Sequence, residues 1–464
     1  MLNRTAVINI VGLTESLLGP GMPRLERFRA GGALARIRPA FPAVTCTAQA
    51  NYLTGATPSQ HGIVANGWYD RQLAETHFWK QSNHLVAGPK IWDELRRRDP
   101  KLTCAQLFWW FNMYASVDYS ITPRPAYPAD GRKVFDIYSS PPNIRPEIKK
   151  DLGEFPFPAF WGPAAGVDGP QGSADAASRW IAESAKWIEQ KYSPTLNLIY
   201  IPHLDYNLQR LGPSSPAIAA DLRRVDDLAA DLISFFQNRG VRVILLSEYG
   251  IVDVQCPVHL NCLFREQGWI TIREELGLEL LDCGASKVFA VADHQVAHIY
   301  INDRSLESRV RDLLLRQPGV ESVLGGKEKA DAGIDHARAG DLIAIAAKDA
   351  WFTYYYWLED SVAPDFARCV DIHRKPGFDP VELFLNPQIS GIKLKIAWRL
   401  LKKKLGFRML MDVIPLDASL VRGSHGRPTA IAAEQPVLIC ESATTGLAPQ
   451  INSTDVYSVL LNQM

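Results

Sequence analysis

The stretch LNLIYIPHLD at residues 196–205 joins a continuous apolar run to polar residues directly after it. Two other stretches have the same form, VINIV at residues 7–11 and VRVILL at residues 241–246. Such runs are typical of strands buried on both faces of a parallel sheet. Helical patterns at residues 174–191 and 215–239 lie between them. This alternation predicts an α/β fold with a doubly wound, mostly parallel sheet between helices, where ligands bind beyond the carboxyl ends of the strands.

Length and composition narrow the class of protein. The chain has 464 residues, is 47% hydrophobic, and carries 50 Lys and Arg against 50 Asp and Glu, so its charge balance gives no indication of a nucleic acid partner. No apolar run reaches the roughly 18 residues that cross a bilayer, and the start of the chain resembles a strand rather than a signal peptide. Seven scattered cysteines, an odd number, predict a cytoplasmic protein without a disulfide framework.

We predict a single α/β domain over residues 1–464 with two insertions. Residues 68–170 are rich in Trp, Tyr and Pro and predict an irregular insertion over the sheet. Its FWWF cluster at residues 108–111 either lines a substrate pocket or simply packs the insertion. Further along, strand, helix and strand patterns predict a βαβ-like unit, followed by two more strands (residues 297–301, 306–317, 320–324, 341–347 and 351–357).

The second predicted insertion, residues 348–420, contains a basic amphipathic helix. Residues 392–407 mix apolar positions with Lys and Arg. A helix of this composition can lie on an anionic membrane surface. Alternatively, it is a solvated helix whose long aliphatic stems pack down on the protein.

One block of sequence carries candidate chemistry. FPAVTCT at residues 41–47, TG at 54–55 and HGIVANG at 61–67 place hydroxyls and an amide around a turn after a strand, a setting that suits a nucleophile facing a phosphate. A threonine hydroxyl must be activated by a base or a metal to act in this way. The alternative is that Thr45 and Thr47 are ordinary strand residues, since β-branched residues favour strands.

This block resembles the nucleophile region of the nucleotide pyrophosphatase/phosphodiesterases in the alkaline phosphatase superfamily. The resemblance implies an alkaline-phosphatase-like fold with inserted cap segments. It also implies that Thr45 attacks phosphorus and that Asn66 holds a phosphoryl oxygen.

In that family two metal ions activate the threonine and clamp the phosphoryl group. Of the expected ligand positions, this chain keeps Asp205 and, in the sequence GSHG, His425. Glu248 replaces an aspartate, while Gln209 and Tyr249 replace histidines, and the early aspartate is absent. The resemblance therefore implies a divalent metal, zinc as one or two ions, held by Asp205, Glu248 and His425, with Gln209 and Tyr249 binding substrate. Further candidate ligands have metal-binding side chains elsewhere in the chain: His203, Asp293, His294, His298, Asp335, His336, Asp371 and His373.

The leading hypothesis is a phosphodiesterase or nucleotide pyrophosphatase-like enzyme. It would catalyse metal-dependent hydrolysis, or group transfer, at a phosphodiester or pyrophosphate bond through a covalent threonine intermediate. Its expected partner is a small phosphodiester or nucleotide-like substrate rather than a nucleic acid polymer. A rival hypothesis is a non-catalytic relative that binds a phosphorylated or lipid-like ligand. A third is a membrane-surface protein that makes peripheral contact through residues 392–407.

Overall fold

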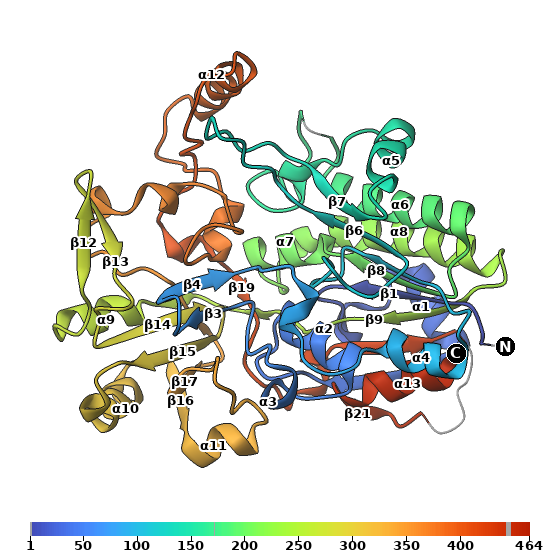
Figure 1. The fold of residues 1–464 in the computed structure, drawn as a ribbon, viewed down its shortest axis with the longest axis horizontal. Coiled ribbons are helices and arrows are strands. Elements are labelled where there is room, and N and C mark those ends of the chain that lie inside the picture. The colour runs from blue at the N-terminus through green and yellow to red at the C-terminus, as the bar shows by residue number, and fades with distance from the viewer. Residues whose placement is uncertain (1, 171, 442–446) are drawn as a thin grey trace.

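A computed structural model describes residues 2–170, 172–441 and 447–464, and a nine-stranded sheet crosses its centre (Figure 1). The strand order is β21-β2-β20-β9-β1-β8-β5-β6-β7. Five adjacent strands, from β9 to β6, run parallel, whereas β20 and β7 are antiparallel to their neighbours. The predicted doubly wound α/β fold is confirmed. The strands are β1 (Thr5–Ile10), β2 (Ala33–Arg38), β5 (Cys104–Leu107), β6 (Tyr119–Pro123), β7 (Ile137–Ser140), β8 (Leu196–Ile201), β9 (Arg242–Leu246), β20 (Val437–Cys440) and β21 (Gln450–Asn452).

Helices cover both faces of this sheet, which explains why the apolar runs of the sequence are continuous. Every residue of β1 and β8 is buried. Figure 1 shows α6 and α8 on one face and α2, α4 and α13 on the other. With no solvent-facing side, these strands lack the alternation of a half-exposed strand. The helices are α1 (Pro23–Gly31), α2 (Thr45–Thr54), α4 (Ile91–Arg98), α6 (Ala176–Tyr192), α8 (Ala219–Gln237) and α13 (Asp455–Gln463).

A second, four-stranded sheet lies beside the first, in the order β14-β15-β17-β16 with antiparallel neighbours. Helix α10 (Glu307–Arg316) connects β15 to β16 and packs on β16. The two strands are parallel to each other, but β17 lies between them. The predicted βαβ-like unit is thus a split βαβ unit. Its strands are β14 (Val288–Asp293), β15 (Val296–Ile301), β16 (Val320–Gly325) and β17 (Leu342–Ala346).

Two expectations about irregular segments need correction. Residues 68–170 are not wholly an insertion over the sheet, because β5, β6 and β7 belong to the sheet itself. These strands have only four or five residues each, too few to show a period among aromatic and proline residues. Within residues 351–357, the strand β18 ends at Phe352. The other short elements are α3 (Pro58–His61), α5 (Ile144–Leu152), α7 (His203–Leu211), α9 (Leu260–Glu266), α11 (Gly326–Asp331), β3 (Gly67–Asp70), β4 (Glu75–Phe78), β10 (Val252–Asp253), β11 (Cys256–Val258), β12 (Ile272–Glu275), β13 (Leu278–Leu281), β18 (Ala350–Phe352) and β19 (Gly423–Ser424).

Residues 387–412 form an excursion from the body of the protein. The excursion carries α12 (Ile392–Lys404), which Figure 1 shows at the far end of a projecting segment. The chain leaves and returns at one place, where the Asn386 N–H donates to the Val413 carbonyl at 2.8 Å. The helix predicted within residues 392–407 is present, close to its expected bounds.

Candidate active site

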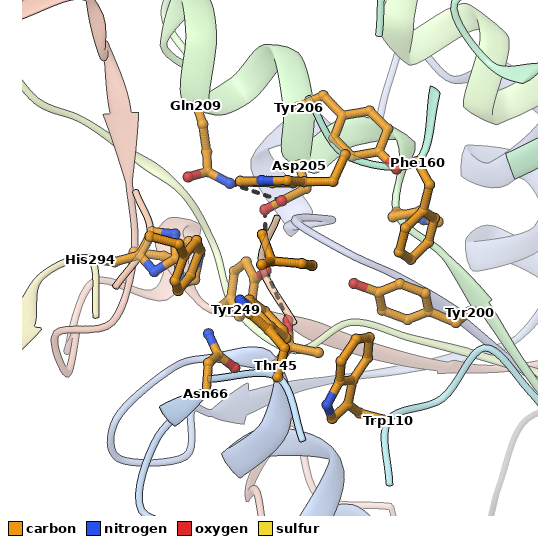
Figure 2. Close-up of a pocket in the computed structure, with 16 residues that line it drawn as sticks. Thr45, Asn66, Trp110, Phe160, Tyr200, Asp205, Tyr206, Gln209, Tyr249 and His294 are labelled. Atoms are coloured by element: carbon orange, nitrogen blue, oxygen red, sulfur yellow. Dashed lines mark hydrogen bonds between the residues drawn. The ribbon is translucent and has the colours of Figure 1, made fainter. Parts of the chain in front are cut away.

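A pocket lies beyond the carboxyl ends of β8 and β9, the place that the doubly wound pattern predicts. It measures about 480 Å³, including the part open to solvent. Segments far apart in sequence meet there, as Figure 2 shows. The lining residues lie on α2, α7 and β8, in the β14–β15 turn, in the 348–420 segment and in other connecting segments: Thr45, Asn66, Trp79, Trp110, Phe160, Trp161, Tyr200, Pro202, Asp205, Tyr206, Gln209, Tyr249, His294, Ile372, Phe378 and His425.

Thr45 is the first residue of α2 rather than part of a strand. The extended backbone of Val44 precedes it, and its side chain faces the pocket. The first N–H groups of a helix have no partner within the helix, so a helix start favours an anionic group. One of these groups, the Cys46 N–H, donates to Asn66 Oδ1 at 3.0 Å. This bond places the Asn66 amide beside the Thr45 hydroxyl.

A chain of hydrogen bonds crosses the pocket from Thr45 to Gln209 (Figure 2). Thr45 Oγ1 lies 3.3 Å from the Tyr249 hydroxyl, which donates to Asp205 Oδ1 at 3.1 Å. Gln209 Nε2 donates to the other oxygen of Asp205 at 2.8 Å. Asp205 and Gln209 are four residues apart on α7 and therefore share one face of that helix.

Two buried carboxyl groups of the site differ in their pKa values. Burial raises the pKa of Asp205 to about 6, against the opposing effects of His294, Tyr249 and Gln209. Burial also raises the pKa of Glu248 to about 8, although hydrogen bonds from Gln49, Asn9 and Thr45 oppose the rise. Of the two buried carboxyl groups, Glu248 holds its proton more strongly, so Asp205 ionises first as pH rises.

The second sheet contributes a carboxylate that fixes Asn66. Asp293, the last residue of β14, accepts from the Asn66 backbone N–H at 2.8 Å and from Asn66 Nδ2 at 3.1 Å. His294 Nδ1 lies 2.8 Å from the same carboxylate. The His425 ring stacks both on the His294 ring and on the Tyr249 ring, and the ring centroids of Tyr249 and His425 are 3.7 Å apart. The site therefore depends on contacts between the two sheets.

The donor set does not fit the predicted metal as it is arranged. Among the residues that the structure describes, no three His, Cys, Asp or Glu side chains lie together in a way that would hold one ion. Both oxygens of Asp205 already accept hydrogen bonds, and Glu248 Oε1 accepts from Asn9 at 2.6 Å and from Gln49 at 2.5 Å. Asp205 is linked to Thr45 through Tyr249, whereas His425 Nδ1 bonds the Ala43 carbonyl at 2.8 Å. Hydrogen-bond donors thus occupy both oxygens of Asp205 and one oxygen of Glu248, where a cation would need to bind.

The pocket is aromatic and lacks cationic side chains. Within the described part of the chain, its lining includes neither Lys nor Arg. Arg210, the residue after Gln209, donates to the carbonyls of Leu383 and Ala165. Four lining side chains have a buried polar atom without a protein partner among the described residues, and such atoms are the groups a bound ligand would meet. They are Trp79 Nε1, Tyr206 Oη, Gln209 Oε1 and His294 Nε2.

Of the histidines considered as further metal ligands, only His294 reaches the pocket. His203 bonds Asp221 at 2.8 Å, and His298 lies 3.1 Å from the Val64 carbonyl. His294 and His298 do not lie on one strand, because His294 is in the β14–β15 turn with φ 59°. His336 and His373 do not line the pocket either.

Several pocket residues were not identified from the sequence. Tyr200 is near the end of the LNLIYI run, where a polar side chain at a carboxyl end is a usable signal. Trp79, Trp161 and Phe378 had no such signal. From the FWWF cluster, Trp110 lines the pocket, while the other three residues pack in hydrophobic cores.

The fold and the site together define a hydrolase of the alkaline phosphatase superfamily. The chain belongs to the type I phosphodiesterase / nucleotide pyrophosphatase family, whose model matches residues 5–379. It is therefore a pyrophosphatase/phosphodiesterase-family hydrolase, as the motif at residues 41–67 predicted. Members of the superfamily typically use divalent metals.

Individual relatives are distant. An uncharacterized pyrophosphatase/phosphodiesterase of Schizosaccharomyces pombe is 22% identical over 217 residues, which cover 46% of this chain but only 37% of that relative. Murine ectonucleotide pyrophosphatase/phosphodiesterase 5, solved as an inactive variant with AMP, has a TM-score of 0.57 and 15% identity over 99% of this chain and 94% of its own. Phosphonoacetate hydrolase of Sinorhizobium meliloti 1021, solved with phosphonoacetate, reaches 0.61 with 14% identity over 99% and 96% of the two chains. These structures share the fold.

Proposed function

We propose that the chain hydrolyses a phosphodiester or pyrophosphate bond in a small, nucleotide-like molecule, with Thr45 as covalent nucleophile. The observation that carries this proposal is the hydrogen-bonded chain from Thr45 through Tyr249 to Asp205. Threonine needs a base to attack, and Asp205 is ionised at neutral pH. The AMP bound to the murine relative supports a nucleotide-like substrate.

In the proposed reaction, Thr45 Oγ1 bonds to phosphorus as the bond from phosphorus to the leaving oxygen breaks. The threonine proton passes to Tyr249 while the phenolic proton moves to Asp205, which later returns it through the same chain. Asn66 Nδ2 and the N–H groups of the first turn of α2 are the donors proposed to bind the phosphoryl oxygens. A water oxygen then bonds to phosphorus as the P–Oγ1 bond breaks, and Thr45 Oγ1 takes back the proton that Asp205 returns through Tyr249. The proton that the water loses passes to solvent and balances the charge of the departed leaving group. No step uses a metal, because the present donors do not fit one.

A cytoplasmic location is part of the proposal. It rests on the cysteines, since cytoplasmic proteins keep their thiols reduced. Within the described part of the chain, six cysteines carry free thiols: Cys46, Cys104, Cys256, Cys262, Cys283 and Cys369.

Replacing the nucleophile tests the proposal directly. We expect Thr45→Ala to abolish hydrolysis of a p-nitrophenyl phosphodiester while circular dichroism shows an intact fold. Thr47→Ala is the matched control, since the Thr47 hydroxyl donates to the Ile63 carbonyl and does not line the pocket. If Thr45→Ala retains activity within about threefold of the parent, under 1 kcal/mol of barrier, Thr45 is not the nucleophile.

The relay is tested separately by Tyr249→Phe, which removes one oxygen and keeps the ring that stacks on His425. We expect kcat to fall by about 10² or more, the usual contribution of a positioned acid or base, with KM little changed. A normal kcat would show that the Thr45 proton leaves by another route. The Glu248 carboxyl, which Thr45 also contacts, would then be the group to replace.

The structure also offers a second candidate function, binding without turnover. The observation in favour of it is that both oxygens of Asp205 already accept hydrogen bonds, from Gln209 and Tyr249. These bonds stabilise the carboxylate and so weaken it as a base. In that case AMP would bind to the parent and to Thr45→Ala equally, measured by calorimetry, and neither would hydrolyse any phosphodiester.

A further inference from the structure

Helix α12 carries an apolar stripe on its outer side. None of its residues is buried, and the exposed fractions of Leu394, Trp398, Leu401 and Leu405 are 78%, 55%, 45% and 64%. The spacings of four, three and four residues place these side chains on one face. Helices of globular proteins normally turn such a face toward a core, whereas here it points away from the body.

The opposite side of α12 explains why the stripe stays exposed. Lys395 and Arg399 both bond Asp412, at 2.8 and 3.1 Å. Lys403 Nζ lies 4.1 Å from the centre of the Phe135 ring. These contacts hold the basic side against the rest of the excursion and its neighbouring loop. Rotation that would cover the leucines would break all three.

Charge identifies the kind of surface that fits this face. Residues 391–412 contain seven Lys and Arg and one acidic residue, Asp412, which is already paired. Lys393, Lys402 and Lys404 flank the stripe and make no ion pair among the described residues. An anionic bilayer presents negative headgroups above an apolar interior, so one flat surface can satisfy both the lysines and the leucines.

Two aromatic side chains strengthen this match. Trp398 lies within the stripe, and Phe407, 62% exposed, continues the apolar surface beyond the end of α12. Tryptophan favours the boundary between headgroups and acyl chains. In the part of the chain that the structure describes, no helix is long and apolar enough to cross a membrane. Any lipid contact through α12 is consequently peripheral.

We propose that the 387–412 excursion docks the protein on an anionic lipid membrane, with the Leu394–Trp398–Leu401–Leu405 face inserted and the flanking lysines at the headgroups. This inference does not depend on the proposed hydrolysis. The docking surface lies at the end of a projection, and none of its residues lines the catalytic pocket.

Co-sedimentation of the full chain with vesicles tests the proposal. We expect binding to phosphatidylcholine vesicles containing phosphatidylserine to be at least about tenfold stronger than to phosphatidylcholine alone, and to weaken with salt. Trp398→Ser with Leu401→Ser should abolish binding to both vesicles. Lys393→Gln, Lys402→Gln and Lys404→Gln together should remove the preference for the anionic lipid.

Matched controls make the result specific. Leu276→Ser changes a fully exposed leucine on the β12–β13 hairpin, and a triple Gln variant of Lys101, Lys150 and Lys327 removes three exposed charges elsewhere. Both controls should bind vesicles as the parent does, and every variant should hydrolyse a soluble substrate at the parent rate. Vesicle binding that the stripe variant does not weaken would overturn the proposal. So would light scattering that shows a dimer dissociating in that variant, because a second copy would then cover the face.

Discussion

At the scale of single residues, the polar side chains that line the site bond to one another. Gln209 and Tyr249 both donate to Asp205, so they act as a pair. The sequence predicted that both bind substrate, and both line the pocket. Their bonds to Asp205 were not predictable, because they depend on the rotamers of three side chains from α7 and the end of β9.

Placing histidine at positions 209 and 249 tests whether Gln209 and Tyr249 serve the reaction better than metal-binding residues would. We expect Gln209→His with Tyr249→His to raise zinc content, measured by elemental analysis of protein purified without chelator, because two donors would become ligands. Turnover of the native substrate should fall, since the relay through Tyr249 is lost. Higher turnover together with more zinc would instead show that the parent site is an impaired metal site.

At the scale of elements, long apolar runs and helices were predictable, and short or paired elements were not. Strand β8 has the expected bounds, and α6 begins two residues later than predicted, because burial on both faces leaves a strong pattern in sequence. Strands β5 to β7 were missed because four or five residues carry too little pattern. The position of β17 between β15 and β16 could not be predicted from the sequence either, because strand order depends on contacts between segments distant in sequence.

The end of α2 provides a prediction at this scale. Gly55 follows α2 with φ +66°, and an added Cβ would lie 3.1 Å from the Tyr457 ring of α13. We expect Gly55→Ala to lower the free energy of unfolding by about 1–2 kcal/mol for the left-handed backbone, and by more for the contact. Gly240 has φ +68° with open space around it, so Gly240→Ala should show the backbone cost alone. Urea denaturation measures both, and equal losses would show that α13 moves aside freely.

At the scale of the whole molecule, buried charged residues of the second insertion hold the pocket residue Trp161 in place. Lys375 pairs with Glu382, whose carboxylate also accepts from the pocket residue Trp161. Burial raises the pKa of the adjacent Asp379 to about 7, mainly against the charge of Lys375. In the folded protein Asp379 therefore keeps its proton over a pH range in which the unfolded chain loses it.

The sign of the resulting pH dependence follows from proton counting. Between about pH 4 and pH 7 the unfolded state binds fewer protons at Asp379, so the free energy of unfolding falls as pH rises, by at most about 1.4 kcal/mol per pH unit. We expect Asp379→Asn to remove this slope, since an amide can still accept from the Val381 N–H. The thermal midpoint of the parent should fall relative to that of the variant as pH rises from 5 to 7. Parallel curves would show that Asp379 ionises normally in the folded protein.

The single backbone bond between Asn386 and Val413 has an evolutionary consequence. Because the excursion starts and ends at one point, residues 387–412 can gain or lose length without shifting the register of any sheet strand. The entropy of closing a surface loop changes slowly with its length, so such changes carry little thermodynamic penalty. We therefore expect homologous chains to differ most in length between the positions of Asn386 and Val413. Some should lack the helix that corresponds to α12, while the nine-stranded sheet stays the same.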